Sequence, residues 1–463
     1  MSDFRASGPQ LRANRLSILF FAAALTVAFS LLPGRASAQG IPLIRDTEIE
    51  NTIRVYIAPV LQAAGIDISS VQIYLVKDQR LNAFVAGGMK IFVHTGLLQE
   101  AADPAQVIGV LAHETGHIVG GHLSRIKDGM RAATTQAIIA SVLGGAAAAA
   151  AGRPEGIGAA ILGGAEIGQR SLLSYTRGME QAADQAGVKF LEGSHQSARG
   201  LRDFMKKLQS EEAQYGSERD PYLRSHPLTD DRIQFIENHV AHSRYSNVPT
   251  PPDLIAAHAR MHGKLNGFLN APVDTMRRYK EDDPSMEAKY ARAIAYMKQN
   301  ETEKAVAVLE PLIAQSPKDP FLHELRGDIL RDAGRAPDAM AAYKAAVDII
   351  PWAALIRMSL AQTQIEINER ALLQEAVVNL KEAIRYEPQV PHAWRQLATA
   401  YGRMEKHGLV SHALAEEAIL KGDYRSAGRL ALRAMKVLPQ GSPEWLRSQD
   451  IDIEAKRLKK ENE

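Results

Sequence analysis

The sequence VLAHETGHIVGGH, residues 110–122, places two histidines four positions apart, with a glutamate directly after the first. Residues four apart lie on one face of an α-helix, so His113 and His117 present two imidazoles, which are strong zinc ligands, to one point. Glu114 projects about 100° further round the helix axis, where it can accept a proton from the attacking water. This H-E-x-x-H pattern predicts a hydrolytic zinc site. The alternative is an ordinary helix whose histidines bond the backbone.

Catalytic zinc needs a third protein ligand and an open fourth position. His122 lies about 140° round the helix from His117, so we expect it to have a structural role. The sequence RGMEQAADQAG, residues 177–187, offers a better ligand, because Glu180 and Asp184 are again four apart. Glu180 would complete a His-His-Glu set, and Asp184 would accept the free N–H of a ligating imidazole and fix its tautomer. The alternative is an exposed acidic helix face.

The helix that carries this stretch is expected to begin at Asp103-Pro104, since aspartate is a good N-cap and proline suits the first helical position. Residues 46–64 repeat apolar side chains at helical spacing and predict another helix.

Between these helices, residues 71–78 and 82–98 are rich in β-branched and aromatic side chains. The Gly87-Gly88 pair separates two apolar runs and indicates a hairpin turn. We therefore expect a small antiparallel sheet, whose hairpin could offer an edge strand to an extended substrate.

The first 38 residues have the layout of a secretory signal peptide. Three arginines precede the apolar run LSILFFAAALTVAFSLL, and the small residues of Ala-Ser-Ala end at Ala38. We expect cleavage after Ala38 and export to the bacterial periplasm. The alternative is an uncleaved membrane anchor, since the run is at the lower edge of spanning length.

Length and composition limit what the protein can be. The whole chain has 463 residues, too many for one hydrophobic core, so two or three domains are expected. The formal charge is +2, and residues 1–38 carry four arginines and one aspartate, or +3, which leaves −1. This balance gives no indication of a nucleic-acid partner. The absence of cysteine excludes disulfides and thiolate ligands.

Residues 131–172 form two Ala/Gly-rich apolar arms around Arg153-Pro154-Glu155. This pattern predicts a helical hairpin with Pro154 at the turn. Three interpretations remain open: a closely packed pair of core helices, a lid beside the active site, or a surface in peripheral contact with a membrane.

The C-terminal part is helical and repetitive. Residues 246–283 read as a linker followed by a bridging helix, and residues 284–463 repeat an apolar helix, a short Gly or Asn turn, a second helix and a proline. Pro317, Pro351 and Pro388 are spaced by 34 and 37 residues, which is typical of tetratricopeptide repeats. Such units stack into an α-solenoid whose concave face binds extended peptides or partner proteins. The alternative is an irregular helical bundle.

H-E-x-x-H followed by E-x-x-x-D resembles the M48 family of zinc metallopeptidases. NAFVAGGMKIFVHTGLL, residues 82–98, is similar to the family's sheet segment, and SHPLTDDRI, residues 225–233, to its His-Pro segment. The order of signal peptide, peptidase and repeats resembles a periplasmic branch of the family. The resemblance implies a zincin-like, mainly α domain over residues 39–245. It also implies one Zn²⁺ per chain bound by His113, His117 and Glu180, with Glu114 as the base.

The His-Pro segment adds two candidate site residues. His226 precedes a proline, which holds its backbone extended. We expect it either to stabilise the oxyanion of the tetrahedral intermediate or to occupy the fourth zinc position and keep the enzyme inactive. The alternative is an ordinary histidine in a surface loop. Arg232 is a candidate catalytic residue and is equally expected to pair with Glu180 or Asp184.

Members of this branch act in quality control of outer-membrane proteins. The resemblance thus implies an endopeptidase for misfolded or misassembled proteins, with possible chaperone activity and with repeats that bind substrates or the outer-membrane assembly machinery. One alternative is a non-proteolytic chaperone or adaptor whose zinc site is latent or structural. Another is a membrane-embedded peptidase, which requires the arms of residues 131–172 to span the bilayer.

Overall fold

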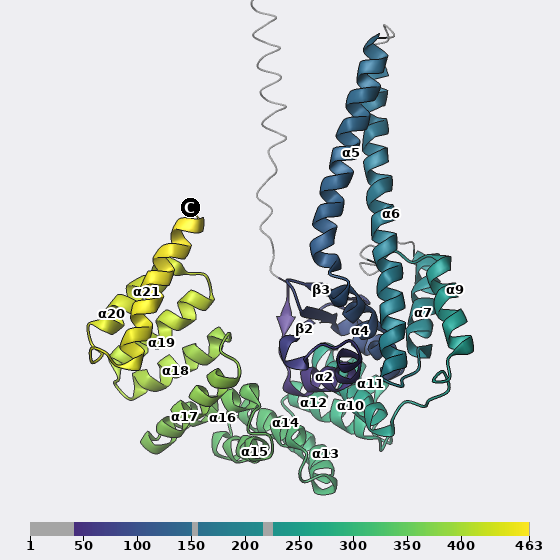
Figure 1. Cartoon of the computed structure of the whole chain (residues 1–463). Coiled ribbons are helices and arrows are strands. Elements are labelled where there is room, and N and C mark those ends of the chain that lie inside the picture. Colours follow the sequence, from purple (N-terminus) through teal and green to yellow (C-terminus); the bar gives the residue numbers. More distant parts are fainter. Residues whose placement is uncertain (1–40, 151–155, 216–225, 463) are drawn as a thin grey trace, which may run out of the picture. The chain divides into compact units, whose positions relative to one another are not determined.

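The structure is a computed structural model that describes residues 41–150, 156–215 and 226–462 (Figure 1). The predicted signal peptide and Pro154 lie outside these residues. The mainly α fold with a small sheet is confirmed, and so is the helix predicted over residues 46–64, which is α2 (Thr47–Ala63).

Four strands form a mixed sheet in the order β1-β2-β4-β3. Their bounds are Leu43–Ile44 (β1), Gln72–Val76 (β2), Ala83–Ala86 (β3) and Lys90–His94 (β4). As predicted, β3 and β4 are an antiparallel hairpin, and Gly87 and Gly88 both adopt a positive φ in its turn.

The prediction of a wholly antiparallel sheet is wrong, because β2 and β4 are parallel. The chain reverses after β2 and places β3 at the far edge, and β4 then returns between them. Ile91 and Val93 of β4 are completely buried, as suits an inner strand. Alternation along the sequence indicates which face of a strand is buried, but it does not say which strands pair.

Helices cover the sheet and hold the site. Helix α4 (Pro104–Val119) follows the short helix α3 (Thr95–Glu100) and begins as predicted, because the Asp103 Oδ1 atom accepts a hydrogen bond from the amide of Ala105 at 2.7 Å. Completely buried side chains of α2, α4 and the sheet form one core, among them Ile53, Leu61, Leu75 and Leu111.

The chain bends sharply at Gly120-Gly121, where Gly121 has a φ of 60°, and α5 (His122–Ala150) begins directly afterwards. Helix α6 (Gly156–Gly193) lies beside α5 (Figure 1), so the described parts of residues 131–172 belong to two long helices that pack side by side. Among the described residues, no helix has both the length and the apolar character needed to cross a membrane. The C-terminal part of α6 carries Glu180 and Asp184 and packs against α4.

Helices α7 (Arg199–Tyr215) and α9 (Asp230–His242) complete the N-terminal part, and α10 (Pro252–Leu269) and α11 (Pro272–Arg278) follow it. Antiparallel helix pairs then continue to the end of the described chain. Their bounds are Met286–Lys298 (α12), Thr302–Gln315 (α13), Pro320–Asp332 (α14), Ala336–Ile349 (α15), Ala354–Ile367 (α16), Arg370–Tyr386 (α17), Pro391–Arg403 (α18), His407–Leu420 (α19), Tyr424–Met435 (α20) and Pro443–Asn462 (α21).

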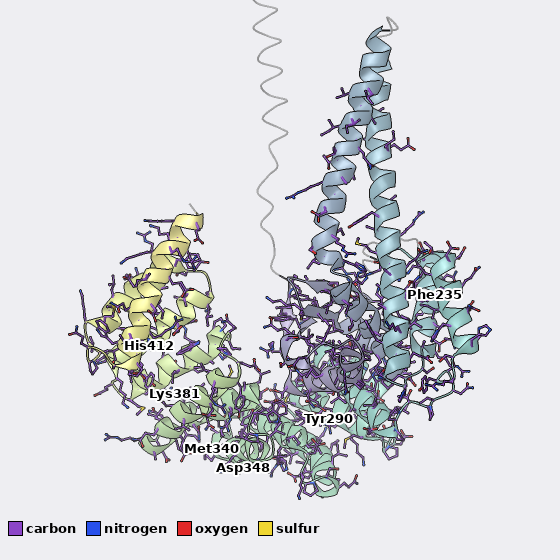
Figure 2. The ribbon with its side chains drawn as sticks, viewed as in Figure 1. Phe235, Tyr290, Met340, Asp348, Lys381 and His412 are labelled. Atoms are coloured by element: carbon purple, nitrogen blue, oxygen red, sulfur yellow. The ribbon has the colours of Figure 1, made fainter. Side chains whose placement is uncertain are left out.

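Four turns within the repeats use the glycine or asparagine that the sequence indicated, whereas the turn between α18 and α19 has Glu405 at a positive φ. Asn300, Gly334, Asn368 and Gly422 all have a positive φ, a conformation that glycine and asparagine tolerate best. The first repeat helix also contacts the N-terminal part. Tyr290 of α12, labelled in Figure 2, is completely buried, and its hydroxyl donates to Glu48 Oε2 of α2 at 2.8 Å.

Candidate metal centre

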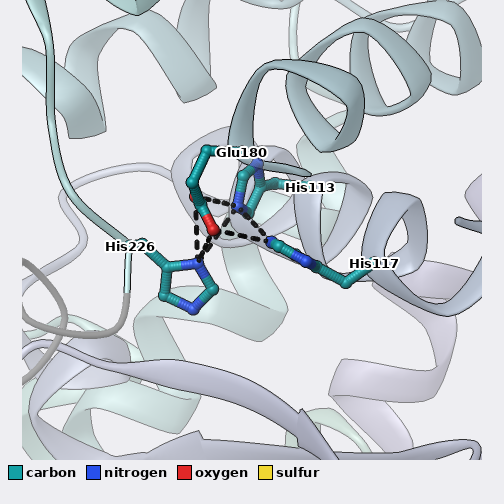
Figure 3. Close-up of side chains that lie close together, drawn as sticks. All are labelled: His113, His117, Glu180 and His226. Atoms are coloured by element: carbon teal, nitrogen blue, oxygen red, sulfur yellow. Dashed lines mark hydrogen bonds and ion pairs between the residues drawn. The ribbon is translucent and has the colours of Figure 1, made fainter. Parts of the chain in front are cut away.

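Four side chains from three segments converge at one point (Figure 3). His113 and His117 come from α4, Glu180 comes from α6, and His226 comes from the segment that precedes α9. One possible ligand atom from each lies within 4.8 Å of the others. The structure thus brings the three predicted ligands together with His226, the candidate for a fourth ligand.

The distances between these atoms suit a small four-coordinate cation. His113 Nε2 lies 3.0 Å from His117 Nε2, 3.3 Å from a Glu180 oxygen and 3.4 Å from His226 Nδ1. His117 Nε2 lies 3.3 Å from Glu180, and His226 Nδ1 lies 3.1 Å from both Glu180 oxygens. Donors at about 2.1 Å from a tetrahedral zinc ion would be about 3.4 Å apart.

The buried carboxylates of the cluster also favour a bound positive charge. Burial alone would lower the pKa of His113, but hydrogen bonds with Asp184 and Glu180 raise it to about 10. Burial lowers the pKa of His117 to about 3, and the neighbouring imidazoles hold the pKa of Glu180 well below its usual range even though burial opposes this. His117 and Glu180 are thus in the forms that bind metal, a neutral imidazole and an ionised carboxylate, and a bound cation would replace the proton that His113 otherwise holds. The residues present therefore fit a zinc ion.

Glu114 lies beside this cluster and faces the cleft. Its side chain is completely buried, and Oε1 lies 3.5 Å from His226 Nε2. Neither carboxylate oxygen accepts a hydrogen bond from any residue that the structure describes. Burial raises the pKa of Glu114, which brings the carboxylate closer to the strength of a general base. A buried acceptor without a donor suits a water molecule or a substrate group in the cleft.

Asp184 and Arg232 contact the ligand side chains and fix their orientation. Asp184 Oδ1 lies 2.8 Å from His113 Nδ1, so the Nδ1–H donates to the carboxylate and Nε2 faces the other ligands. Arg232 binds both oxygens of Asp184 at 2.6 and 2.9 Å and lies 3.1 Å from Glu180 Oε2. The sequence predicted Arg232 to pair with either acid, and it pairs with both. Its guanidinium is buried behind the ligands, which suits a positioning role.

His122 contacts His117, although on a continuous helix the two side chains would point in different directions. Because α4 ends at Val119, the His122 ring turns back, and its Nδ1 atom lies 3.0 Å from His117 Nδ1. It stays outside the ligand cluster and contacts the far side of the His117 ring. The Gly120-Gly121 pair, which favours a break in the helix, was the signal for this contact in the sequence.

Small residues allow α6 to approach α4 closely enough for Glu180 to reach the histidines. A Cβ atom on Gly116 would lie 2.5 Å from the carbonyl oxygen of Ala183, which is completely buried. The neighbouring Ala182 is exposed and takes no part in this contact. The close approach therefore depends on Gly116 and Ala183.

A cleft of about 350 Å³ opens onto the cluster. Its walls include Glu114, His117, Glu180 and His226, together with Asn82, Phe84 and Val85 of the β3 segment. Since β3 is an outer strand of the sheet and β4 is an inner one, the edge available to an extended peptide is β3.

Comparison with known proteins agrees with this geometry. The sequence profile of peptidase family M48 matches residues 45–240, and a tetratricopeptide repeat profile matches residues 290–354. The chain is 25% identical over 437 residues to a beta-barrel assembly-enhancing protease of Yersinia pestis, which covers 93% of this chain and 86% of that protein.

The corresponding protease of Escherichia coli K12 is 26% identical over 407 residues, or 87% of this chain and 82% of that protein. The mitochondrial metalloendopeptidase OMA1 of Schizosaccharomyces pombe is 26% identical over 179 residues, or 38% of this chain and 49% of that protein.

Proposed function

We propose that this chain, whose residues 45–240 match the profile of peptidase family M48, is a zinc-dependent endopeptidase that hydrolyses misfolded or misassembled proteins in the periplasm. Its metallopeptidase character and its repeats follow from the family matches and the similar proteases. The identity of the metal, the substrates and the compartment are our proposal.

The observation that carries the proposal is the convergence of His113, His117 and Glu180 beside the buried Glu114. We propose that the first three bind one zinc ion. A bound zinc ion would polarise the scissile carbonyl and make water more acidic. Glu114 then takes a proton from the attacking water and passes it to the leaving amine.

Asp184 and His122 act on the ligands themselves. Each contacts the Nδ1 atom of one ligating histidine, and both contacts favour the tautomer whose Nε2 lone pair faces the metal. Arg232 neutralises Asp184 and fixes the Glu180 carboxylate.

We propose that His226 occupies the fourth ligand position at rest and leaves it when substrate enters. Its Nδ1 contacts with His113 and Glu180 support this role over that of an oxyanion donor, which would face the substrate. Replacing His226 with alanine should then raise the cleavage rate. A loss of cleavage with metal retained would instead favour the oxyanion role.

The proposed substrates are extended segments that add to the edge of β3. Main-chain pairing is insensitive to sequence, which suits an enzyme that acts on unfolded chains. The similar bacterial proteins are called beta-barrel assembly-enhancing proteases, which supports the proposal that outer-membrane proteins and their assembly machinery are the substrates and partners. The predicted signal peptide supports the periplasm.

We also propose that the α5–α6 hairpin makes peripheral contact with a membrane surface. Ile138, Ile139, Val142, Leu143 and Leu162 are 52–74% exposed, and residues 132–152 contain no charged side chain. Vesicle flotation tests this contact: the variant with Ile138→Ser and Ile139→Ser should float less than wild type. Val378→Ser, at a comparably exposed valine on α17, is the control.

The main experiment combines metal analysis with cleavage of casein. Wild-type protein should contain one zinc ion per chain and cleave casein. Glu114→Gln should retain zinc and lose cleavage, because the base is lost and the ligands remain. Glu100→Gln, at an exposed glutamate, should leave both unchanged. Zinc binding without cleavage of any unfolded substrate by wild type would favour the chaperone or adaptor function.

A further inference from the structure

A second cleft lies where the peptidase part meets the repeats. It encloses about 430 Å³, within the range of about 300–1,000 Å³ that is usual for ligand sites. One wall is formed by Asp46 and by Lys264 and Phe268 of α10, and the other by side chains of α14, α16 and α18. We call it the junction cleft. It is separate from the metal centre, with which it shares no lining residue.

The polar end of the junction cleft contains more carboxylates than cations. Lys264 Nζ lies 2.7 Å from Asp46, 3.1 Å from Glu48 and 3.8 Å from Glu324, and Arg260 bridges Glu48 and Asp319. The charged side chains that line the cleft are three acids, Asp46, Glu324 and Asp328, and two bases, Arg45 and Lys264, and Arg45 is paired with Glu50 and Glu387, which do not line it. Burial and the neighbouring carboxylates raise the pKa of Glu324 to about 8.

Two acceptor atoms of the cleft walls lack hydrogen-bond donors. Glu324 Oε2 and Gln396 Oε1 are both buried, and neither accepts a hydrogen bond from any described residue. Gln396 is only 7% exposed, and its amide nitrogen is already used by Gln362 and His392, so the free oxygen is held in place. Leaving a buried acceptor unsatisfied costs stability, which a ligand that donates hydrogen bonds would recover.

The cleft is also lined by apolar side chains. They are Leu355 and Met358 of α16 and Leu265, Phe268 and Leu269 of α10. A ligand for this site therefore needs a cationic donor and apolar groups beside it. Lysine or arginine with apolar neighbours in an extended polypeptide meets both requirements, and the inner helices of a repeat solenoid are suited to bind extended chains.

We propose that the junction cleft binds a lysine or arginine side chain of an unfolded polypeptide, with the cation near Glu324 and Gln396 and the neighbouring apolar side chains against Leu355, Met358 and Phe268. This inference deepens the proposed function, since it gives the repeats a substrate feature to recognise. Bound in this way, a chain is held on the protein independently of cleavage at the metal centre.

The test measures binding in the whole chain with Glu114→Gln, so that its result does not depend on proteolysis. The probes are two short, unstructured, fluorescein-labelled peptides that are identical except for a central lysine or norleucine between leucines. Fluorescence anisotropy should show that the lysine peptide binds about tenfold more tightly, as expected for a charge-assisted hydrogen bond. Equal affinity of the two peptides would overturn the proposal.

Variants then locate the site. Glu324→Gln should abolish the lysine preference, whereas Glu303→Gln, at an exposed glutamate on α13, should keep it. Gln362→Lys, which places the protein's own cation in the cleft and retains Glu324, should also abolish it. Circular dichroism establishes that each variant is folded. A lysine preference that survives in both cleft variants would overturn the proposal, as would calcium binding in the cleft without peptide binding.

Discussion

The Nδ1 atoms of His117 and His122 lie 3.0 Å apart, so one ring donates a proton to the other. If His117 is to present the Nε2 lone pair to a metal, its proton must be on Nδ1, and His122 must accept it. This contact forms because the chain bends at Gly120-Gly121, and a Cβ atom on Gly120 would lie 2.3 Å from the His122 ring. The bend at Gly120-Gly121 therefore places the residue that orients the His117 ligand.

Replacing His122 with phenylalanine should lower metal affinity by about ten- to a hundredfold, because the ring shape is retained and the acceptor is lost. Competition with a chromogenic chelator measures the change. His242→Phe, which removes an exposed histidine of α9, is the matched control and should bind metal like wild type. Unchanged affinity in His122→Phe would mean that the contact does not orient the ligand.

Replacing Gly116 with valine should separate α4 from α6, because the new Cβ atom would meet the backbone of Ala183. We expect a loss of about 1–3 kcal/mol in the free energy of unfolding and a loss of bound metal as Glu180 moves away. Urea denaturation and metal analysis measure the two effects.

Gly178→Ala on α6 is the matched control for Gly116→Val. No atom lies within 4 Å of the Cβ position at Gly178, so alanine should raise helix stability by up to about 1 kcal/mol and leave metal content unchanged. Wild-type metal content in Gly116→Val would show that the close approach is not required.

Replacing Val85 with proline should impair binding of extended substrates. The amide of His94 donates to the carbonyl of Asn82, so these two residues form a hydrogen-bonded pair. Hydrogen-bonded and non-hydrogen-bonded pairs alternate along an antiparallel ladder, which puts Val85 and Ile91 in a non-hydrogen-bonded pair. The Val85 N–H therefore points away from β4, toward the free edge of β3. Proline removes this donor without breaking a ladder hydrogen bond.

We expect a drop of about tenfold in kcat/KM for an unfolded substrate, with Val85→Ile close to wild type. Thermal denaturation of both variants establishes whether the sheet is intact. A folded Val85→Pro variant with unchanged kcat/KM would contradict substrate pairing at β3.

His258 should make the protein less stable in acid. It is buried, its Nδ1 atom lies 3.2 Å from the Tyr56 hydroxyl, and its Nε2–H donates to the carbonyl of Ala101 at 2.8 Å. Burial lowers its pKa to about 4 from an ordinary value of 6.5. The unfolded chain thus binds a proton more readily than the folded one, so stability is complete above pH 6.5 and falls as the pH drops toward 4.

The His258 contribution is about 3.5 kcal/mol, from about 1.4 kcal/mol per pKa unit over the shift from 6.5 to about 4. Urea denaturation of wild type and His258→Gln at neutral and acid pH gives the loss of unfolding free energy in acid for each protein. The difference between the two losses is the contribution of His258, because the other titrating groups are common to both proteins. The glutamine variant should lose less stability in acid. Identical pH dependence would show that His258 does not titrate as its environment indicates.

The sequence by itself determined the features that depend on neighbouring residues. Histidines four apart on a helix share a face wherever that helix lies, so the pairing of His113 with His117 was predictable. Asp103 and Pro104 start α4 for local reasons of capping, and Gly87-Gly88 turns the β3–β4 hairpin because glycine tolerates a positive φ. The repeats were visible because each unit encodes the same local geometry.

Only the tertiary structure decided what depends on segments that are distant in the sequence. The return of β4 between β2 and β3, the burial of Arg232 behind Asp184 and the orphaned acceptors of the junction cleft all arise when separate elements pack together. Packing depends on the shape and volume of every surface that meets, and periodicity in one segment carries no information about its neighbour's shape.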